Sequence, residues 1–234
     1  MEKTKVLSFH NDIKIKQKYL SRLEVHRQAD EIIKGKYWEE GKGCAVGCTV
    51  HSSSHDVYPV ELGICWQLAL VEDGLFENLP NEDAKNFPIE FLEAIPVGIN
   101  TDVVYRKWVL WVLADEKEGL INVIKNEEHK KALQSVADLY TLSFEREIKH
   151  SEWKKLADKY AYTSTYSSAY TYASAYAYSS ASAYASEYAS AYASASASAS
   201  DSERQEIKNK WQEIKNKRIF LMKDKLIDLL KEGK

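Results

Sequence analysis

The residues that decide the fold are Thr101-Asp-Val-Val-Tyr-Arg-Lys-Trp-Val-Leu-Trp-Val-Leu-Ala114. When this segment is wound as a helix it is apolar on nearly every side, which is typical of a helix buried at the centre of a domain. We therefore predict a central helix here, carrying Val104, Trp108, Trp111 and Val112, with amphipathic helices packed around it.

Glycine and proline are distributed unevenly along the chain. All four prolines and eight of the nine glycines lie at or before Gly119, and neither residue type occurs from Leu120 to Glu232. An ordered β domain of that length would need turns, which are usually built with Gly, Asn, Asp or Pro. The sequence therefore predicts an all-α protein.

Amphipathic periodicity predicts four further helices in the first 150 residues. Apolar side chains recur every three or four positions over residues 15–33, and Gly35 follows as a stop signal. Pro59 stands at the favoured first position of a second helix, which Pro80 ends. The remaining two helices are expected over residues 88–95 and 128–149.

The chain divides into three predicted parts: a compact helical head (1–150), a low-complexity Ala/Ser/Tyr tract (151–200) and an amphipathic C-terminal helix (201–234). Tyrosines in the tract stand at even positions and alanines at odd ones. Alternation is typical of a strand, but one strand of about 40 residues would stretch about 130 Å. A small residue at every fourth position favours a helix that approaches a neighbour closely. A disordered linker is the alternative.

The C-terminal helix is expected to begin at Asp201, because Ser200 and Glu203 have the spacing of a capping box. A seven-residue unit starts at Gln205 and again at Gln212, and an apolar stripe accompanies it. Such heptads favour packing against another helix. Residues 160–230 are therefore the predicted surface of a homo-oligomer, and packing on the head is the alternative.

The composition excludes several classes of protein. With a formal net charge of −3 the chain is neither a strongly basic nucleic-acid binder nor a strongly acidic protein. Its longest apolar run, residues 108–114, is far shorter than the roughly 18 residues of a membrane span, and its start lacks a signal-peptide pattern. Three cysteines, an odd number, argue against a disulfide framework. We expect a cytoplasmic protein whose partner is neither a membrane nor a nucleic acid.

Candidate chemistry is concentrated in a glycine-rich loop expected over residues 39–57. One interpretation is an anion site, in which glycines free the backbone to point N–H groups inward and polar side chains add donors. The residues concerned are Gly41, Lys42, Gly43, Gly47 and Thr49. The flanking Trp38 and Trp66 are candidates for the wall of a pocket for a planar, nucleobase-like ligand, with packing in the core as the alternative.

Two other interpretations of the same loop involve its cysteines and histidines. Cys44 and Cys48, with His51 and His55, have half-site spacings for zinc, although only two residues separate the halves. A thiol nucleophile is the other hypothesis, with Cys48 activated by His55 and oriented by Asp56, or with His26 and Asp30 supplying the base. A tight structural loop with buried cysteines is the alternative to all three.

The run Tyr37-Trp-Glu-Glu-Gly-Lys-Gly-Cys-Ala-Val-Gly-Cys-Thr49 resembles the signature of an uncharacterised family found in phage and bacterial genomes. Residues 62–80 and 87–96 resemble it as well. The family's head is followed by an Ala-rich repetitive tract and a short amphipathic helix, whereas the tract here is rich in Ser and Tyr. The family has no established activity, so the resemblance implies no catalytic residues.

We therefore expect a non-enzymatic binding protein of phage type. It would bind a small anionic, nucleotide-like ligand or a host protein, and it would assemble through its helical tract. The alternatives are a Cys- or zinc-dependent hydrolase that uses residues 44–55, and a purely structural helical rod. The residues identify no cofactor.

Overall fold

The computed structural model describes residues 6–160 and 201–233. It divides the chain into two compact units, unit 1 (residues 1–108 and 223–234) and unit 2 (residues 109–222). These units differ from the three predicted parts, because two helices, α6 (Thr101–Ala114) and α11 (Asp201–Glu232), each contribute to both units. Of the predicted Ala/Ser/Tyr tract (151–200), residues 161–200 lie outside the described residues, and so do the predictions of their helical form and close packing.

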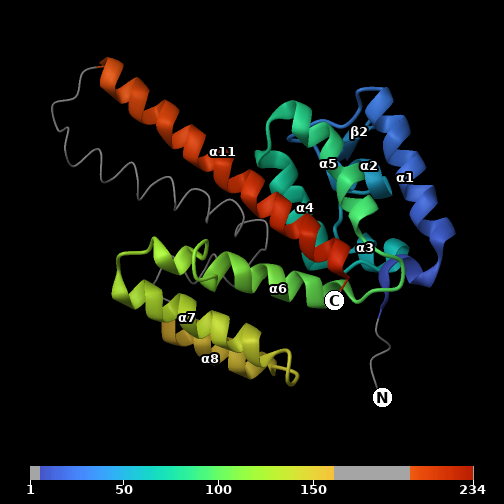
Figure 1. Cartoon of the computed structure of the whole chain (residues 1–234). Coiled ribbons are helices and arrows are strands. Elements are labelled where there is room, and N and C mark those ends of the chain that lie inside the picture. Colours follow the sequence, from blue (N-terminus) through green and yellow to red (C-terminus); the bar gives the residue numbers. More distant parts are fainter. Residues whose placement is uncertain (1–5, 161–200, 234) are drawn as a thin grey trace. The chain divides into compact units, whose positions relative to one another are not determined.

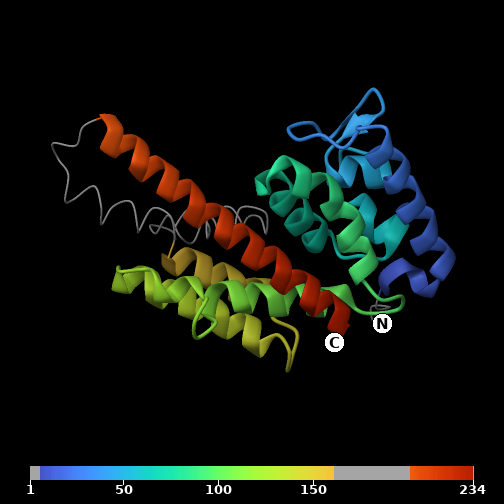
Figure 2. The ribbon, with the colours of Figure 1, turned by 45° about the horizontal axis from the view of Figure 1, so that its top comes forward.

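Unit 1 is built around a short buried helix, α2 (Ala45–Val50), all six residues of which are buried. The helix α1 (Ile13–Gln28) and the pair α4 (Trp66–Asn78) and α5 (Asn81–Ala94) pack against it (Figure 1). Unit 1 also contains η1 (Ser8–Asn11), α3 (Val57–Leu62), an antiparallel hairpin of β1 (Trp38–Glu39) and β2 (Lys42–Gly43), and parts of α6 and α11. The hairpin lies next to α2 (Figure 2).

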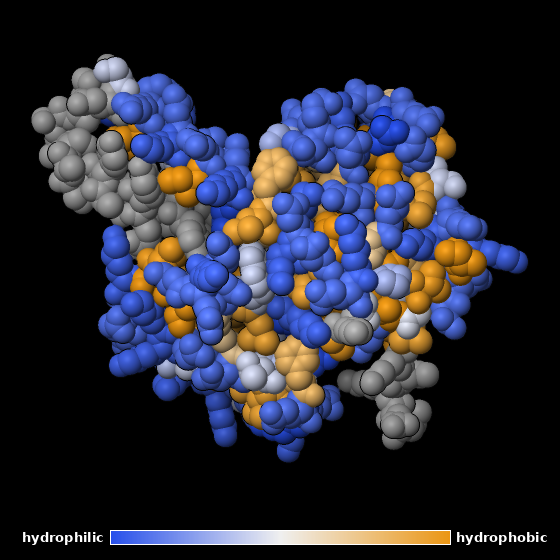
Figure 3. Space-filling model, viewed as in Figure 1, coloured by the Kyte–Doolittle hydropathy of each residue, from blue (hydrophilic) through white to orange (hydrophobic). Residues whose placement is uncertain are grey.

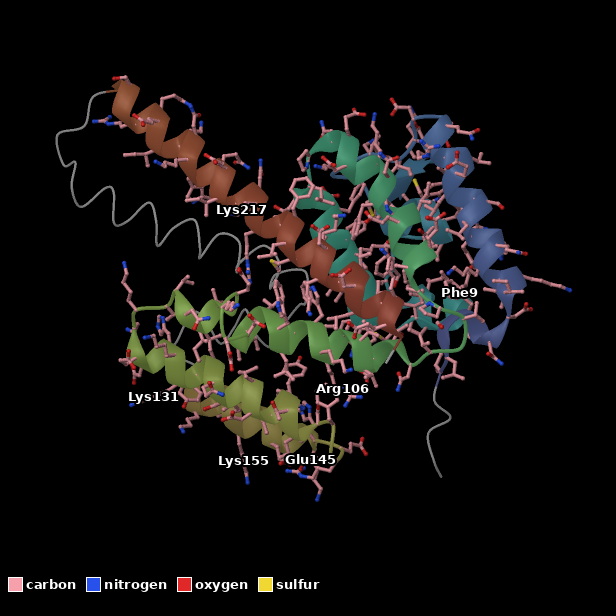
Figure 4. All side chains as sticks on the ribbon, in the orientation of Figure 1. Phe9, Arg106, Lys131, Glu145, Lys155 and Lys217 are labelled. Atoms are coloured by element: carbon pink, nitrogen blue, oxygen red, sulfur yellow. The ribbon has the colours of Figure 1, made fainter. Side chains whose placement is uncertain are left out.

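Unit 2 contains η2 (Leu120–Asn122), α7 (Glu127–Leu142) and α8 (His150–Tyr160), together with parts of α6 and α11. Tyr140 of α7 meets Trp153 of α8 edge-on, with ring centroids 5.1 Å apart. Lys131 and Lys155, labelled in Figure 4, are exposed side chains of the same two helices. This helix pair therefore buries aromatic surface on one side and presents charge to solvent on the other.

The predicted all-α class is confirmed for the described residues, with the small hairpin as an addition. The central helix α6 spans Thr101–Ala114 as expected, and Val104, Trp108 and Val112 on it are fully buried. On the face shown in Figure 3 the surface is mainly hydrophilic, with apolar side chains in small patches. No described helix has the length and apolar character that crossing a bilayer requires.

Four predicted helix boundaries are wrong. The helix expected over residues 15–33 already ends at Gln28. The helix expected from Pro59 to Pro80 is broken into α3 and α4 at Gly63, whose φ of +64° ends α3 and whose absent Cβ would lie 2.0 Å from Leu7 O. The helix expected over residues 88–95 begins at Asn81, so that Pro88 stands inside α5. Burial of the Phe87 and Phe91 side chains holds α5 together there despite the missing N–H of the proline. The helix expected over residues 128–149 ends at Leu142.

The chain enters α1 through a strained turn. The three residues from Phe9 to Asn11 have φ between 49° and 60°, a left-handed conformation that costs roughly 1–2 kcal/mol per residue without glycine. Ser8 anchors the turn, since its N–H donates to Ile99 O (2.9 Å) and its hydroxyl to Pro96 O (2.6 Å). Phe9, labelled in Figure 4, is fully buried. These contacts hold the turn in place and fix where α1 begins.

Candidate functional site

The segment predicted as one glycine-rich loop folds into the hairpin, α2 and the turn that follows. A Cβ on Gly47 would lie 1.5 Å from Tyr37 O, and one on Gly43 would lie 2.1 Å from the same atom. Both glycines therefore serve close backbone packing, which seats α2 against the residues that lead into β1.

The groups predicted to bind an anion are largely engaged within the protein. Gly43 N–H donates to Glu31 O (3.1 Å) and Cys44 N–H to Lys36 O (2.6 Å). The buried Thr49 hydroxyl donates to Ala45 O (2.8 Å). Lys42 is exposed on β2, Gly41 forms the hairpin turn with φ +83°, and Trp66 lies 41% exposed at the start of α4. Backbone hydrogen bonds to the segment between α1 and β1 use the N–H groups of Gly43 and Cys44, so these two do not form an anion nest.

The cysteines are placed as small core residues. Cys48 is fully buried, and its Sγ lies 3.3 Å from Gly43 O, an acceptor for the thiol hydrogen. Burial raises the pKa of Cys48 to about 12. Burial, followed by the nearby Asp73 carboxylate, raises the pKa of Cys44 as well. A thiol nucleophile must ionise, so this environment disfavours Cys48 in that role.

We expect the thiols of the native protein to react slowly. Burial also raises the pKa of Cys65 to about 12, so at pH 8 each thiol should react roughly 1,000-fold more slowly with Ellman's reagent than a free cysteine. All three cysteines should react at once in guanidinium chloride. A fast phase in the folded protein would show that one cysteine is accessible and ionised.

A chain of hydrogen-bonded side chains connects α1 to the turn after α2. Glu31 Oε2 lies 2.6 Å from His26 Nδ1, and His26 Nε2 lies 2.8 Å from His51 Nε2. His26 is 7% exposed, whereas His51 is exposed. Trp38 stacks on the His51 ring with centroids 4.3 Å apart and planes inclined by 13°. We call these four residues the histidine relay.

The protonation pattern of the relay follows from its acceptors. An ionised Glu31 only accepts hydrogen bonds, so His26 Nδ1 carries a hydrogen. With both rings neutral, His26 Nε2 then accepts from the Nε2–H of His51, which leaves the His51 Nδ1 lone pair unprotonated. Within the described part of the chain, His51 Nδ1 has no hydrogen-bond partner. Burial, and then the charge of Arg22, lower the pKa of His51, which favours its neutral form.

Arg22 stands one helical turn before His26 on α1, close to the relay. Its Nη1–H donates to Thr49 O (2.8 Å), and its guanidinium lies over the Tyr19 ring (5.1 Å). Its other N–H groups have no partner among the described residues. Arg22 is therefore a fixed cation with donors to spare beside His51.

A second group of polar side chains lies around Tyr37, the residue that precedes β1. His55 Nε2 lies 3.3 Å from Asp73 Oδ2, and Tyr37 meets the His55 ring edge-on (5.7 Å). The residue before Asp73 on α4, Glu72, is fully buried and accepts a hydrogen bond from the Tyr58 hydroxyl (2.7 Å). Glu72 Oε1 and Asp73 Oδ1 are buried without a hydrogen-bond partner in the described structure. Burial raises the pKa of Glu72 well above its usual value, which favours the protonated form of this carboxyl.

The four residues with zinc spacing do not converge on one point: Cys44 lies near Asp73, and the other three have separate partners. His51 pairs with His26, His55 pairs with Asp73, and Cys48 points to a carbonyl oxygen. Residues 6–160 and 201–233 contain no group of three His, Cys, Asp or Glu side chains arranged to hold a metal ion. The residues present therefore do not fit the predicted Cys2His2 site, because the short loop winds into α2 and sends its side chains in different directions.

Sequence reasoning identified Trp38, His51 and His26 but missed Glu31 and Arg22. His26 had been paired with Asp30 at a helical step of four, whereas α1 ends at Gln28 and the chain turns back, so that Glu31 faces the ring. Asp30 forms an ion pair with Lys85 instead (2.7 Å). The spacing of four between Arg22 and His26 was an available signal, since it places both on one face of α1.

Unit 1 also has a pocket of ≈ 320 Å³ next to Asp30 and the start of α5. Lys34 and Lys85 line it, together with the apolar Ile33 and Phe76. Lys34 Nζ donates to Leu79 O, and Lys85 pairs with Asp30. Because the ammonium groups of Lys34 and Lys85 already have partners, this pocket is less suited to bind an anion than the surface beside Arg22.

The chain matches no known protein family, and no curated protein or solved structure is significantly similar to it. The candidate site is therefore interpreted from its own geometry.

Proposed function

We propose that the protein binds a small ligand that combines a planar ring with one negative charge, and that the ligand occupies the surface formed by Trp38, His51 and Arg22. The observation that carries the proposal is the stack of Trp38 on an exposed His51 beside a cation with free donors. Aromatic faces attract planar rings, and an arginine fork binds phosphate oxygens.

The charge around this surface limits the ligand to a low negative charge. Arg22 is the cation next to His51, and the carboxylates of Glu31 and Glu61 also act on the His51 ring. Tyr19 donates a hydrogen bond to Glu61, and His26 contacts Glu31, so both carboxylates have partners. A monoanionic phosphodiester suits a surface with one arginine and two carboxylates better than a dianionic phosphate does.

The test is calorimetric titration with cyclic AMP, adenosine and inorganic phosphate. We expect cyclic AMP to bind more tightly than either part alone. Arg22→Gln should weaken its binding by about 10- to 100-fold, because a charged hydrogen bond contributes roughly 1.5–3 kcal/mol.

Arg27→Gln is the matched control, since Arg27 is exposed on the same helix and pairs with Glu24 (2.6 Å) away from the relay. This variant should bind cyclic AMP like the native protein. Absence of binding, or equal losses in both variants, would contradict the proposal.

The other functional predictions concern features that the described residues do not test. The phage-type origin, a host protein as partner, the cytoplasmic location and the assembly through residues 160–230 all stay predictions. The free state of all three cysteines is compatible with a reducing compartment. Size-exclusion chromatography of the full-length protein checks the assembly prediction, because a monomer would contradict it.

A further inference from the structure

We propose that the same surface hydrolyses phosphodiesters, with His51 Nδ1 as the general base that takes a proton from the attacking water. This inference rests on the proposed binding function and adds an activity to it. The sequence suggested a hydrolase that uses cysteines or zinc. This inference assigns the hydrolytic role to His51 instead, whose side chain is exposed.

The geometry of the relay is the first argument. Glu31 contacts His26 (2.6 Å), and His26 contacts His51 (2.8 Å), in a line that runs from a half-buried carboxylate to an exposed ring. A base that is held in one tautomer by a second group, itself anchored by a carboxylate, is the arrangement by which histidines accept protons efficiently. The stacked Trp38 fixes the plane of the His51 ring, so that Nδ1 keeps one direction.

The charges that face His51 are compatible with this role. The titratable and charged groups that face His51 are Arg22 and His26 on α1, Glu31 after α1 and Glu61 on α3. Burial and the charge of Arg22 favour the neutral ring, which is the form that accepts a proton. When His51 becomes protonated, Glu31 and Glu61 stabilise the imidazolium, and Arg22 stays free to hold the phosphoryl oxygens.

Water is the only co-reactant that this hydrolysis needs. A water oxygen forms a bond to phosphorus while its proton passes to His51 Nδ1. The bond between phosphorus and the ester oxygen breaks, and the leaving alkoxide takes the proton from His51. The products are a phosphomonoester and an alcohol, and nothing is oxidised or reduced.

The test uses bis(p-nitrophenyl) phosphate, a monoanionic diester with planar rings, and measures p-nitrophenolate release by the full-length protein. We expect release above the buffer rate, and His51→Gln should lower this rate about 100-fold or more. His51 is exposed, so this variant should fold normally. His129→Gln on α7 is the matched control and should retain the native rate.

The pH dependence separates a base from a structural residue. The rate should rise with pH and reach half its plateau below pH 6.5, since the pKa of His51 is lowered from that value. Glu31→Gln should lower the rate and move the midpoint to lower pH, because it removes a negative charge that stabilises the imidazolium. If Glu31→Gln leaves the midpoint of the pH–rate profile unchanged, Glu31 does not influence the pKa of His51, and the proposed role of the relay is wrong.

The proposal of hydrolysis and the proposal of ligand binding can be contradicted independently of each other. Binding of cyclic AMP without any diester hydrolysis, or hydrolysis that persists in His51→Gln, would overturn this inference and leave the proposed binding intact. Loss of both cyclic AMP binding and hydrolysis in the native protein would overturn the two together.

Discussion

The substitution Gly47→Ala is expected to destabilise unit 1 by about 3 kcal/mol or more, a value at the upper end of the range for overpacked sites. The added methyl group would lie 1.5 Å from Tyr37 O and 2.6 Å from Tyr37 C, so this backbone leaves it no room. Relief requires α2 to move away from the hairpin, which separates Trp38 from His51. Denaturant unfolding followed by circular dichroism measures the loss.

Gly35→Ala is the control for this prediction. A Cβ at Gly35 meets nothing within 4 Å, although its φ of +78° is unfavourable for alanine. The expected loss is only about 1–2 kcal/mol, which comes from the left-handed backbone. Equal losses at the two positions would show that α2 is not packed against Tyr37 as described.

The second large effect is expected from Glu72 and depends on pH. The pKa of this buried carboxyl is raised in the folded protein, whereas in the unfolded chain it titrates near 4.5. Above pH 4.5 unfolding therefore releases a proton, so the stability contributed by Glu72 falls as the pH rises. The decline is about 1.4 kcal/mol for each pH unit until the folded pKa is reached.

Glu72→Gln should remove this decline, because the amide has a similar shape and stays neutral. The variant and the native protein should have similar free energies of unfolding near pH 4.5, and the variant should become progressively more stable towards pH 8. Glu82→Gln on the exposed start of α5 should leave the pH dependence unchanged. A constant difference between Glu72→Gln and the native protein across this range would show that Glu72 is ionised in the folded state.

The sequence predicts those elements of the fold that depend on periodicity. Residues 101–114 form the expected helix because nearly every side of it is apolar and it becomes buried. Breaks that depend on distant contacts were not predictable. Gly63 ends α3 because the backbone of Leu7, more than fifty residues earlier, lies against it, and Pro88 is tolerated because α5 is held by the core.

The sequence predicts several residues of the candidate site, but it does not predict which side chains contact each other. Trp38, His51 and His55 belong to the segment that the sequence singled out, and the structure brings Trp38 and His51 together. The glycines suggested an anion nest, whereas Gly43 and Gly47 allow close packing, and this distinction depends on where Tyr37 lies. Glu31 reaches His26 only because α1 ends at Gln28 and the chain reverses.

The hydrogen-bonded line from Glu31 through His26 to His51 is tested most directly by long-range ¹H–¹⁵N spectra of histidine-labelled protein at pH 7. The account predicts a neutral His51 that is protonated on Nε2 and unprotonated on Nδ1, a His26 protonated on Nδ1, and a nitrogen–nitrogen coupling across the bond between the two rings. A His51 protonated on Nδ1 that shows no coupling to His26 would contradict the relay, and with it the proposed site.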